Sequence, residues 1–163
     1  MKLSEFMKIL DFERMLELAY KKIGAFDADV LYIYTDFRYF GSYAALYDSR
    51  DQFCRALVAP FLAREKTIVL TTFTYTSEGQ FDVLRSPTKL GAMNKWILTQ
   101  PGCRRSEHPL FSYAALGSDA ALVETIGKSA FGYDSVFERL YDRKTAFLHI
   151  GRQYPLVILH FTT

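Results

Sequence analysis

Several residue types and patterns are scarce in this 163-residue sequence, and each scarcity argues against a class of protein. Two cysteines, Cys54 and Cys103, are too few for a disulfide framework or a zinc site of usual spacing, which favours reduced thiols and a cytoplasmic protein. Charges at Lys2, Glu5 and Lys8 do not fit the apolar region of a signal peptide. No uncharged run is long enough to span a bilayer, so we expect no membrane partner.

Net charge and familiar ligand motifs are sparse as well. A formal net charge of +2 is too small to indicate nucleic-acid binding. The sequence contains no GxxxxGK(S/T) loop and no GxGxxG run, so no motif supports a nucleotide site. It also lacks GxSxG, HExxH and a Cys-His nucleophile arrangement, and we expect no metal site.

Apolar residues, in contrast, are abundant. Half of the sequence is hydrophobic, and it contains 14 Phe and 11 Tyr, so the chain can bury a core without disulfides. There is no internal repeat and no low-complexity linker. We therefore predict one domain over residues 1–163.

Hydrophobic periodicity predicts helices that alternate with strands. Helical patterns cover residues 4–23, 49–63, 86–100, 118–126 and 135–143. Strand patterns cover Val30–Tyr34, Thr67–Phe73, Phe111–Leu116, Thr145–Ile150 and Leu156–Phe161. This alternation predicts an α/β layered domain with a largely parallel or mixed sheet.

Three of these helical segments carry more detailed expectations. In the first helix the predicted apolar stripe is Phe6, Ile9 or Leu10, Leu16 and Ile23, and Asp11 leaves open a kink or a second helix start. In the third, Ser86 is the expected N-cap, Pro87 the first helical residue and Pro101-Gly102 the end. Ser135 to Glu138 has the pattern of a capping box that opens the last helix.

The carboxyl ends of the strands are the expected ligand edge of such a sheet. The loops after Tyr34, after Thr71 and around Glu107-His108 therefore form the candidate site. The loop from Thr35 to Gly41 could present N–H groups to a phosphate or an oxyanion, although an ordinary turn is the simpler interpretation. The start at Ser86-Pro87-Thr88 could bind an anion, although most helix starts bind nothing.

His108 is the candidate catalytic residue, because a neutral imidazole near pH 7 can accept a proton. Glu107 could orient the ring and Pro109 stiffens the backbone. A surface or capping histidine is the alternative. His149 and His160 lie in apolar strand patterns, where core residues are expected.

Two further features have both a functional and a structural interpretation. Arg104 and Arg105 could pair with an anionic ligand, but adjacent arginines more often face solvent. The aromatic residues between positions 32 and 47 could stack on a ligand, but more often form core or a partner surface.

Four blocks of the sequence resemble the aminoglycoside 3-N-acetyltransferase family. They are DVLYIYTDF with a following Phe-Gly (Asp29 to Gly41), Thr72 to Thr74, SPTKLGA (Ser86 to Ala92) and RSEHPLFSYAALG (Arg105 to Gly117). The segment from Phe131 to Leu140 fits as well. The order and approximate spacing agree over roughly residues 12 to 150, which is most of the chain.

The resemblance implies an α/β/α fold and a transferase, an acyltransferase associated with antibiotic resistance. It would move the acetyl group of acetyl-CoA to an amine of an aminoglycoside or other amino sugar. His108 corresponds to the histidine of the Arg-Ser-x-His-Pro block, so the resemblance assigns it general-base catalysis. Glu107, beside it, is the second candidate catalytic residue. It places acetyl-CoA against three groups of residues: Thr35, Asp36, Phe37, Arg38 and Gly41; Thr72, Phe73 and Thr74; and Ser86, Pro87 and Thr88.

Three departures from the family pattern bear on the acceptor and on activity. Phe111 stands where antibiotic-modifying members often carry a second histidine, as in relatives associated with polysaccharide amino sugars. No acidic cluster is present for a polycationic acceptor. The sequence from Leu159 to Thr163 ends where the family continues, so we expect the N-terminal portion of a longer fold. The alternative function is a non-catalytic remnant or interaction domain, and self-association is left open.

Overall fold

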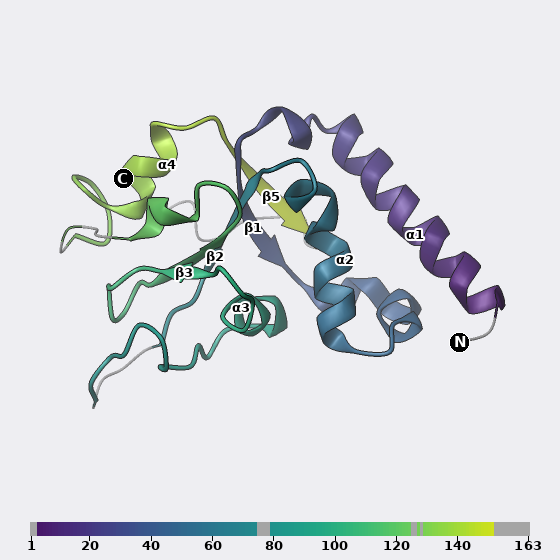
Figure 1. Cartoon of the computed structure of the whole chain (residues 1–163), viewed down its shortest axis with the longest axis horizontal. Helices are drawn as coiled ribbons and strands as arrows, with labels where there is room; N and C mark the ends of the chain where they lie inside the picture. Colours follow the sequence, from purple (N-terminus) through teal and green to yellow (C-terminus); the bar gives the residue numbers. More distant parts are fainter. Residues whose placement is uncertain (1–2, 75–78, 125–126, 128, 152–163) are drawn as a thin grey trace.

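The computed structural model describes residues 3–74, 79–124, 127 and 129–151, which form a sheet between two layers of helices (Figure 1). The elements in chain order are α1 (Leu3–Lys22), η1 (Ala25–Asp27), β1 (Val30–Thr35), η2 (Phe37–Leu46), α2 (Arg50–Leu62), β2 (Thr67–Thr71), α3 (Ala92–Ile97), β3 (Arg104–Arg105), β4 (Tyr113–Leu116), η3 (Ala120–Val123), α4 (Val136–Tyr141) and β5 (Thr145–Ile150).

The sheet has the strand order β3-β4-β2-β1-β5 and is mixed, as predicted. β1 runs parallel to both β2 and β5, whereas β2 and β3 run antiparallel to β4. β1 pairs with β5 from Val30 to Thr35, but with β2 only from Val30 to Tyr32. The paired segments of β1 and β2 therefore end before the carboxyl ends of these two strands.

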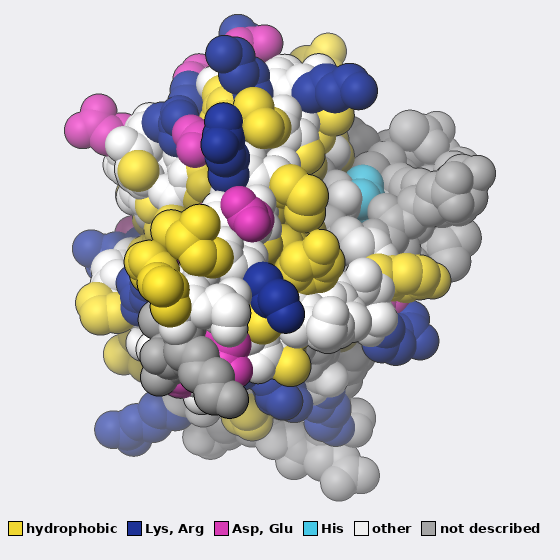
Figure 2. All heavy atoms as spheres, turned by 90° about the vertical axis from the view of Figure 1, so that its right-hand side faces the viewer, with side chains coloured by type: hydrophobic (Ala, Val, Ile, Leu, Met, Phe, Trp, Pro, Cys, Tyr) yellow, Lys and Arg dark blue, Asp and Glu magenta, His cyan; other side chains and the backbone are white. Residues whose placement is uncertain are grey.

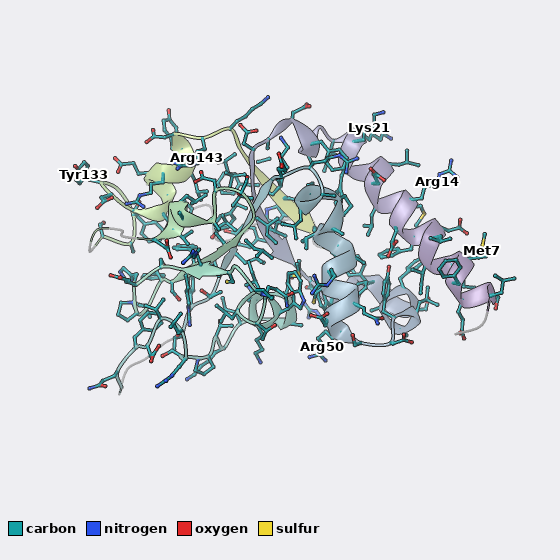
Figure 3. The ribbon with its side chains drawn as sticks, in the orientation of Figure 1. Met7, Arg14, Lys21, Arg50, Tyr133 and Arg143 are labelled. Atoms are coloured by element: carbon teal, nitrogen blue, oxygen red, sulfur yellow. The ribbon has the colours of Figure 1, made fainter. Side chains whose placement is uncertain are left out.

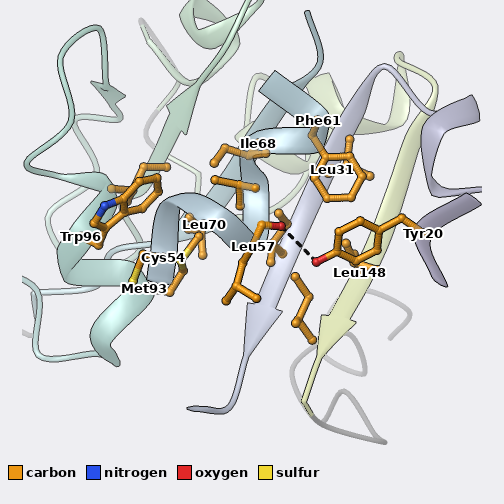
Figure 4. Close-up of a cluster of buried hydrophobic side chains, with 14 of the residues drawn as sticks. Tyr20, Leu31, Cys54, Leu57, Phe61, Ile68, Leu70, Met93, Trp96 and Leu148 are labelled. Atoms are coloured by element: carbon orange, nitrogen blue, oxygen red, sulfur yellow. Dashed lines mark hydrogen bonds between the residues drawn. The ribbon is translucent and has the colours of Figure 1, made fainter. Parts of the chain in front are cut away.

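Side chains of β1 alternate between the two faces of the sheet, because successive residues of a strand point to opposite sides. Leu31 and Ile33 pack with α1, α2 and α3, and we call this face the α2 side. Val30 and Tyr32 pack with η3 and α4, and we call this face the α4 side. The α2 side holds most of the aliphatic core (Figure 4), and both sides contain several aromatic rings.

Helix α1 is continuous through Asp11, which answers the question of a break. Its predicted apolar stripe is only partly right, since Leu16 packs against the core. Phe12 and Tyr20 are the buried residues, whereas Phe6, Leu10 and Ile23 are 41%, 43% and 63% exposed. The reason is that α1 packs through the i, i+8 pair of rings against the aromatic side chains of η1, η2 and α2.

The outer surface of α1 carries mixed side chains. Met7, Arg14 and Lys21 lie along the side of the helix that faces away from the sheet (Figure 3). The view onto this end shows hydrophobic side chains interspersed with basic and acidic ones (Figure 2). A pocket of about 540 Å³ beside α1 includes Arg14, Lys21 and Arg64. No helix in the described ranges is long and apolar enough to cross a bilayer.

The predicted helix start at Ser86-Pro87 is also wrong, since the helix begins at Ala92 and spans six residues. Asp82 explains the difference. Its carboxylate accepts hydrogen bonds from the N–H groups of Leu84 and Arg85 (2.8 and 3.0 Å), and its own N–H donates to Ser86 Oγ (2.9 Å). These local bonds form a turn in place of a helix.

The other predicted helix starts are confirmed in part. Ser49 caps α2 by accepting a hydrogen bond from Gln52 N–H, and Ser135 caps α4 by accepting one from Glu138 N–H (both 3.2 Å). The Glu138 carboxylate accepts from Asp134 N–H, one residue before the position of a capping box. The pattern at 118–126 contains the 3-10 helix η3, and the predicted strand Leu156–Phe161, with His160, lies outside the described residues.

Candidate functional site

The predicted ligand edge is formed by the end of β2 and the beginning of β4. β4 runs antiparallel to β2, and Thr71 at the end of β2 pairs with Tyr113 at the start of β4. The segment after β2 and the turn before β4, which carries His108, therefore lie at the same edge of the sheet. This matches the expectation drawn from the strand pattern.

Thr72 and Ser112 join these two segments. Thr72 N–H donates to Ser112 O at 2.8 Å, and Ser112 Oγ–H donates to Thr72 O at 2.9 Å. The two hydroxyl oxygens lie 3.2 Å apart, and both residues are completely buried. Buried, fully paired polar groups of this kind fix local geometry, so the base of the His108 turn is held rigidly on β2.

Arg105 ties a third segment to the same place. Its side chain is 95% buried, and its guanidinium donates to the carbonyl oxygens of Thr72, Val83 and Ser86 and to the hydroxyls of Thr74 and Ser112. Burial lowers the pKa of Arg105. Arg105 forms no ion pair within the described ranges, so its charge adds a positive potential at this edge.

The two neighbouring arginines thus have different roles, which the sequence does not reveal. Arg104 is exposed and pairs with Glu124 at 3.4 Å, as expected for a surface residue. Arg105 points the other way because the two residues form β3, where successive side chains alternate. A two-residue strand is too short to give a periodic signal, so the sequence does not reveal which of the two arginines is buried.

The Ser86 to Thr88 segment lies against the end of β2, as predicted, although it is not helical. Thr88 Oγ1–H donates to Phe73 O at 2.9 Å, and Lys89 N–H donates to the same oxygen at 3.3 Å. The structure therefore brings Thr72–Thr74, Ser86–Thr88 and the His108 turn together. The helix-dipole argument for an anion at Ser86 does not hold, because no helix begins there.

The His108 ring is half-buried and held by the backbone. Nδ1 accepts a hydrogen bond from Phe111 N–H at 3.0 Å. A neutral imidazole whose Nδ1 accepts carries its proton on Nε2. Glu107 is exposed and makes no hydrogen bond or ion pair within the described part of the chain, so Phe111 N–H is the group that orients the ring here.

Aromatic rings connect His108 to the α4 side of the sheet. The Phe111 ring lies 5.7 Å from His108, 5.2 Å from Phe73 and 5.7 Å from Phe131, between ring centroids. Phe73 in turn contacts Tyr113 edge-to-face at 5.7 Å. Edge-to-face and tilted pairs at these separations are favourable, so the His108 turn is continuous with the aromatic core.

The Thr35 to Gly41 segment lies at the same edge, on the β5 side of β1. Asp36 N–H donates to Ile150 O at 2.9 Å, and the Asp36 carboxylate pairs with Arg38 at 2.6 Å. A Cβ on Gly151 would lie 2.4 Å from Asp36 O, so only glycine permits this close approach. The segment forms the start of 3-10 helix η2, which is kinked at Gly41.

His149 agrees with its predicted place in the core. It lies in β5, is half-buried and stacks on Tyr34 with the rings 4.8 Å apart and 5° from parallel. Among the residues that the structure describes, no group of three or more His, Cys, Asp and Glu is placed to hold a metal ion.

The fold and the site define a three-layer α/β/α protein with a histidine turn at the carboxyl end of a central strand. The family model described as aminoglycoside 3-N-acetyltransferase matches residues 51–159, more than half of the chain, and the chain belongs to this family. The resemblance seen in the sequence is therefore confirmed. No curated protein sequence matches the chain.

Solved structures show the same fold. The structure of AAC-VIa bound to sisomicin has 26% sequence identity and a TM-score of 0.74, over 91% of this chain and 63% of that chain. AAC(3)-Xa has 18% identity and a TM-score of 0.74, over 91% and 59%. The YokD protein from Bacillus subtilis has 17% identity and a TM-score of 0.67, over 84% and 63%. The chain thus spans less than two thirds of the length of each.

Proposed function

We propose that the chain transfers the acetyl group of acetyl-CoA to an amine of an aminoglycoside or other amino sugar. The observation that carries this proposal is the His108 turn, fixed by Thr72–Ser112 bonds and by Arg105 at the ligand edge of a protein of this family. Sisomicin, an aminoglycoside, is the ligand of the AAC-VIa structure.

In this reaction the amine nitrogen attacks the thioester carbonyl carbon. A C–N bond forms, the C–S bond breaks, and CoA leaves as a thiolate. His108 accepts the proton that the nitrogen loses and returns it to the thiolate. Nδ1 is the basic atom of the neutral ring, so it must give up its hydrogen bond from Phe111 N–H before it can accept the proton. Losing one backbone hydrogen bond costs about 1 kcal/mol. General-base catalysis accelerates a reaction about 10²- to 10⁴-fold, which corresponds to a larger free energy than that cost.

Acetyl-CoA would bind along the same edge. Thr72–Thr74 and Ser86–Thr88 lie beside the His108 turn, and Thr35–Gly41 follows the neighbouring strand. The buried charge of Arg105 favours an anionic ligand such as CoA by long-range attraction, while its N–H groups remain committed to protein oxygens.

The test is calorimetric titration with acetyl-CoA, followed by a thiol-release assay over a panel of amino sugars. His108→Ala is expected to lower kcat by about 10²- to 10⁴-fold and leave the Kd of acetyl-CoA within about twofold. Glu107→Gln tests the second residue assigned to catalysis: its exposed carboxylate bonds to nothing in the described ranges, so kcat should change little if Phe111 N–H alone orients the ring. Turnover unchanged in His108→Ala would exclude the assigned base.

A second candidate is a domain that keeps the fold without turnover. The observation that favours it is the hydrogen bond from Phe111 N–H to Nδ1 of His108, which occupies the basic atom in this structure. A cooperatively folded protein that binds acetyl-CoA but releases no thiol with any acceptor would support this candidate over the first.

A further inference from the structure

Two tyrosine hydroxyls on the α4 side are buried without a hydrogen-bond partner. Tyr32 is 0% exposed, and neither its Oη nor that of Tyr34 has a hydrogen-bond partner of good geometry, although the hydroxyls of Tyr32, Tyr34 and Tyr113 lie close enough to interact. Buried polar groups are nearly always hydrogen-bonded, because an unmet hydroxyl costs about 1–3 kcal/mol. Two such groups on one strand call for an explanation.

The α2 side provides the matched comparison. Tyr20 is 3% exposed, and its hydroxyl donates to Leu57 O at 3.0 Å (Figure 4). The same side chain at nearly the same burial is therefore satisfied on one face of the sheet and unsatisfied on the other. The difference is specific to the face that leads to His108.

The unpaired hydroxyls lie in a continuous set of rings. The Tyr32 ring is 5.0 Å from Tyr34 and 6.1 Å from Tyr113, and Tyr113 leads through Phe73 to the Phe111 ring beside His108. Tyr34 follows Tyr32 in β1, beyond the last residue that pairs with β2. Tyr34 thus belongs to the part of β1 nearest the ligand edge, and Tyr32 precedes it on the same face of the sheet.

We propose that the hydroxyls of Tyr32 and Tyr34 bind an uncharged polar group of a substrate, either a hydroxyl of the acceptor sugar or an amide of the CoA arm. This proposal rests on the proposed acetyltransferase function and names a binding site for it. Each phenol offers one donor and two acceptor positions, which suits groups that both donate and accept.

The surroundings explain why the bound group is uncharged. The rings of Tyr34, Tyr113, Phe137 and Phe147 surround Tyr32, and none of these side chains carries a carboxylate. Burial also raises the pKa of Tyr32, so its hydroxyl stays protonated. An ion in such a site would lose its hydration without a counter-charge, whereas a hydroxyl or amide would exchange water for two phenols.

The first experiment measures thermal unfolding without ligand. Tyr20→Phe removes a made hydrogen bond and should lower Tm by about 2–4 °C. Tyr32→Phe removes a hydroxyl that lacks such a hydrogen bond, so Tm should stay unchanged or rise. A fall in Tm of Tyr32→Phe equal to that of Tyr20→Phe would show that the hydroxyl already has a partner, and would overturn the proposal.

The second experiment titrates Tyr32→Phe and Tyr34→Phe separately with acetyl-CoA and with glucosamine. Loss of one hydrogen bond should weaken one of the two ligands about tenfold, and the ligand affected identifies the source of the bound group. Tyr20→Phe should bind both as the wild type does. Wild-type affinity of both variants for both ligands would overturn the proposal. If the wild type binds neither ligand, the acetyltransferase function itself fails, and the Tm comparison still reports on the hydroxyls.

Discussion

The two faces of the sheet differ in their core, in the helices that cover them and in the hydrogen bonding of their buried tyrosines. The α2 side is mainly aliphatic, is covered by the long helices α1 and α2, and bonds its buried Tyr20 hydroxyl to the backbone. The α4 side has a smaller core of aliphatic and aromatic side chains and is covered by the short helices η3 and α4. It leaves the hydroxyls of Tyr32 and Tyr34 without a hydrogen-bond partner of good geometry. The first face is complete as a core, whereas the second contains unmet polar groups that a ligand could satisfy.

The difference teaches that burial alone does not reveal function. Tyr20 and Tyr32 would look alike in any tabulation of exposure. Their hydrogen bonding separates a hydroxyl that stabilises the fold from one that lowers its stability. Unmet polar groups cluster on the side where the Phe111 ring contacts His108.

The largest effects should come from deleting one ring on each face. Phe61→Ala and Phe137→Ala remove buried rings and should each lower the free energy of unfolding by about 3–5 kcal/mol in urea titrations. Only Phe137→Ala should also weaken substrate binding, because Phe137 packs on Tyr32 and Tyr113. Equal loss of affinity in the two folded variants would remove the functional distinction between the faces.

A smaller effect is expected where the α4 side meets the loops. Arg105→Met keeps the length of the side chain but leaves the oxygens of Thr72 and Ser86 without their donor, and should cost about 2–4 kcal/mol. Arg104→Met is the control, since its exposed pair with Glu124 should contribute less than about 1 kcal/mol. Chemical denaturation measures both, and similar values for the two variants would contradict the structural role of Arg105.

The smallest effect of a single substitution should be on the pH dependence of stability at alkaline pH. Burial raises the pKa of Tyr20 on one face and of Tyr32 and Tyr113 on the other, so these groups stay protonated in the folded state above pH 10 and ionise in the unfolded state. Burial also raises the pKa of Cys54 and Cys103, so stability should begin to fall near pH 9 and fall more steeply above pH 10, by about 1.4 kcal/mol per pH unit for each group. Tyr20→Phe or Tyr113→Phe should each reduce the slope by one group, and a flat profile to pH 11 would contradict this assignment.

The strands were the most predictable part of the molecule. β5 has the predicted bounds, and β1 and β2 differ from theirs by one or two residues, because runs such as Thr-Ile-Val-Leu-Thr have few alternatives to a buried strand. The ligand edge followed from the strands, and with it the correct placement of His108 beside Thr72–Thr74.

The errors have local causes that periodicity does not report. One carboxylate, that of Asp82, takes the N–H groups that would begin a helix at Ser86. The choice between Arg104 and Arg105 depends on a two-residue strand. The unpaired hydroxyls of Tyr32 and Tyr34 depend on what lies opposite them in three dimensions, and sequence identifies only that both residues belong to a strand.

The pairing of β1 has a consequence for the speed of folding. β1 pairs with β2 across η2 and α2, but its longer ladder is with β5, from which almost the whole described chain separates it. Closing the larger loop costs more entropy, and pairings distant in sequence are slow to form. We therefore expect β1, α2 and β2 to assemble early and β5 to dock late. The approach of Gly151 to Asp36, and with it the Thr35–Gly41 end of the ligand edge, would then be among the last parts of the molecule to become native.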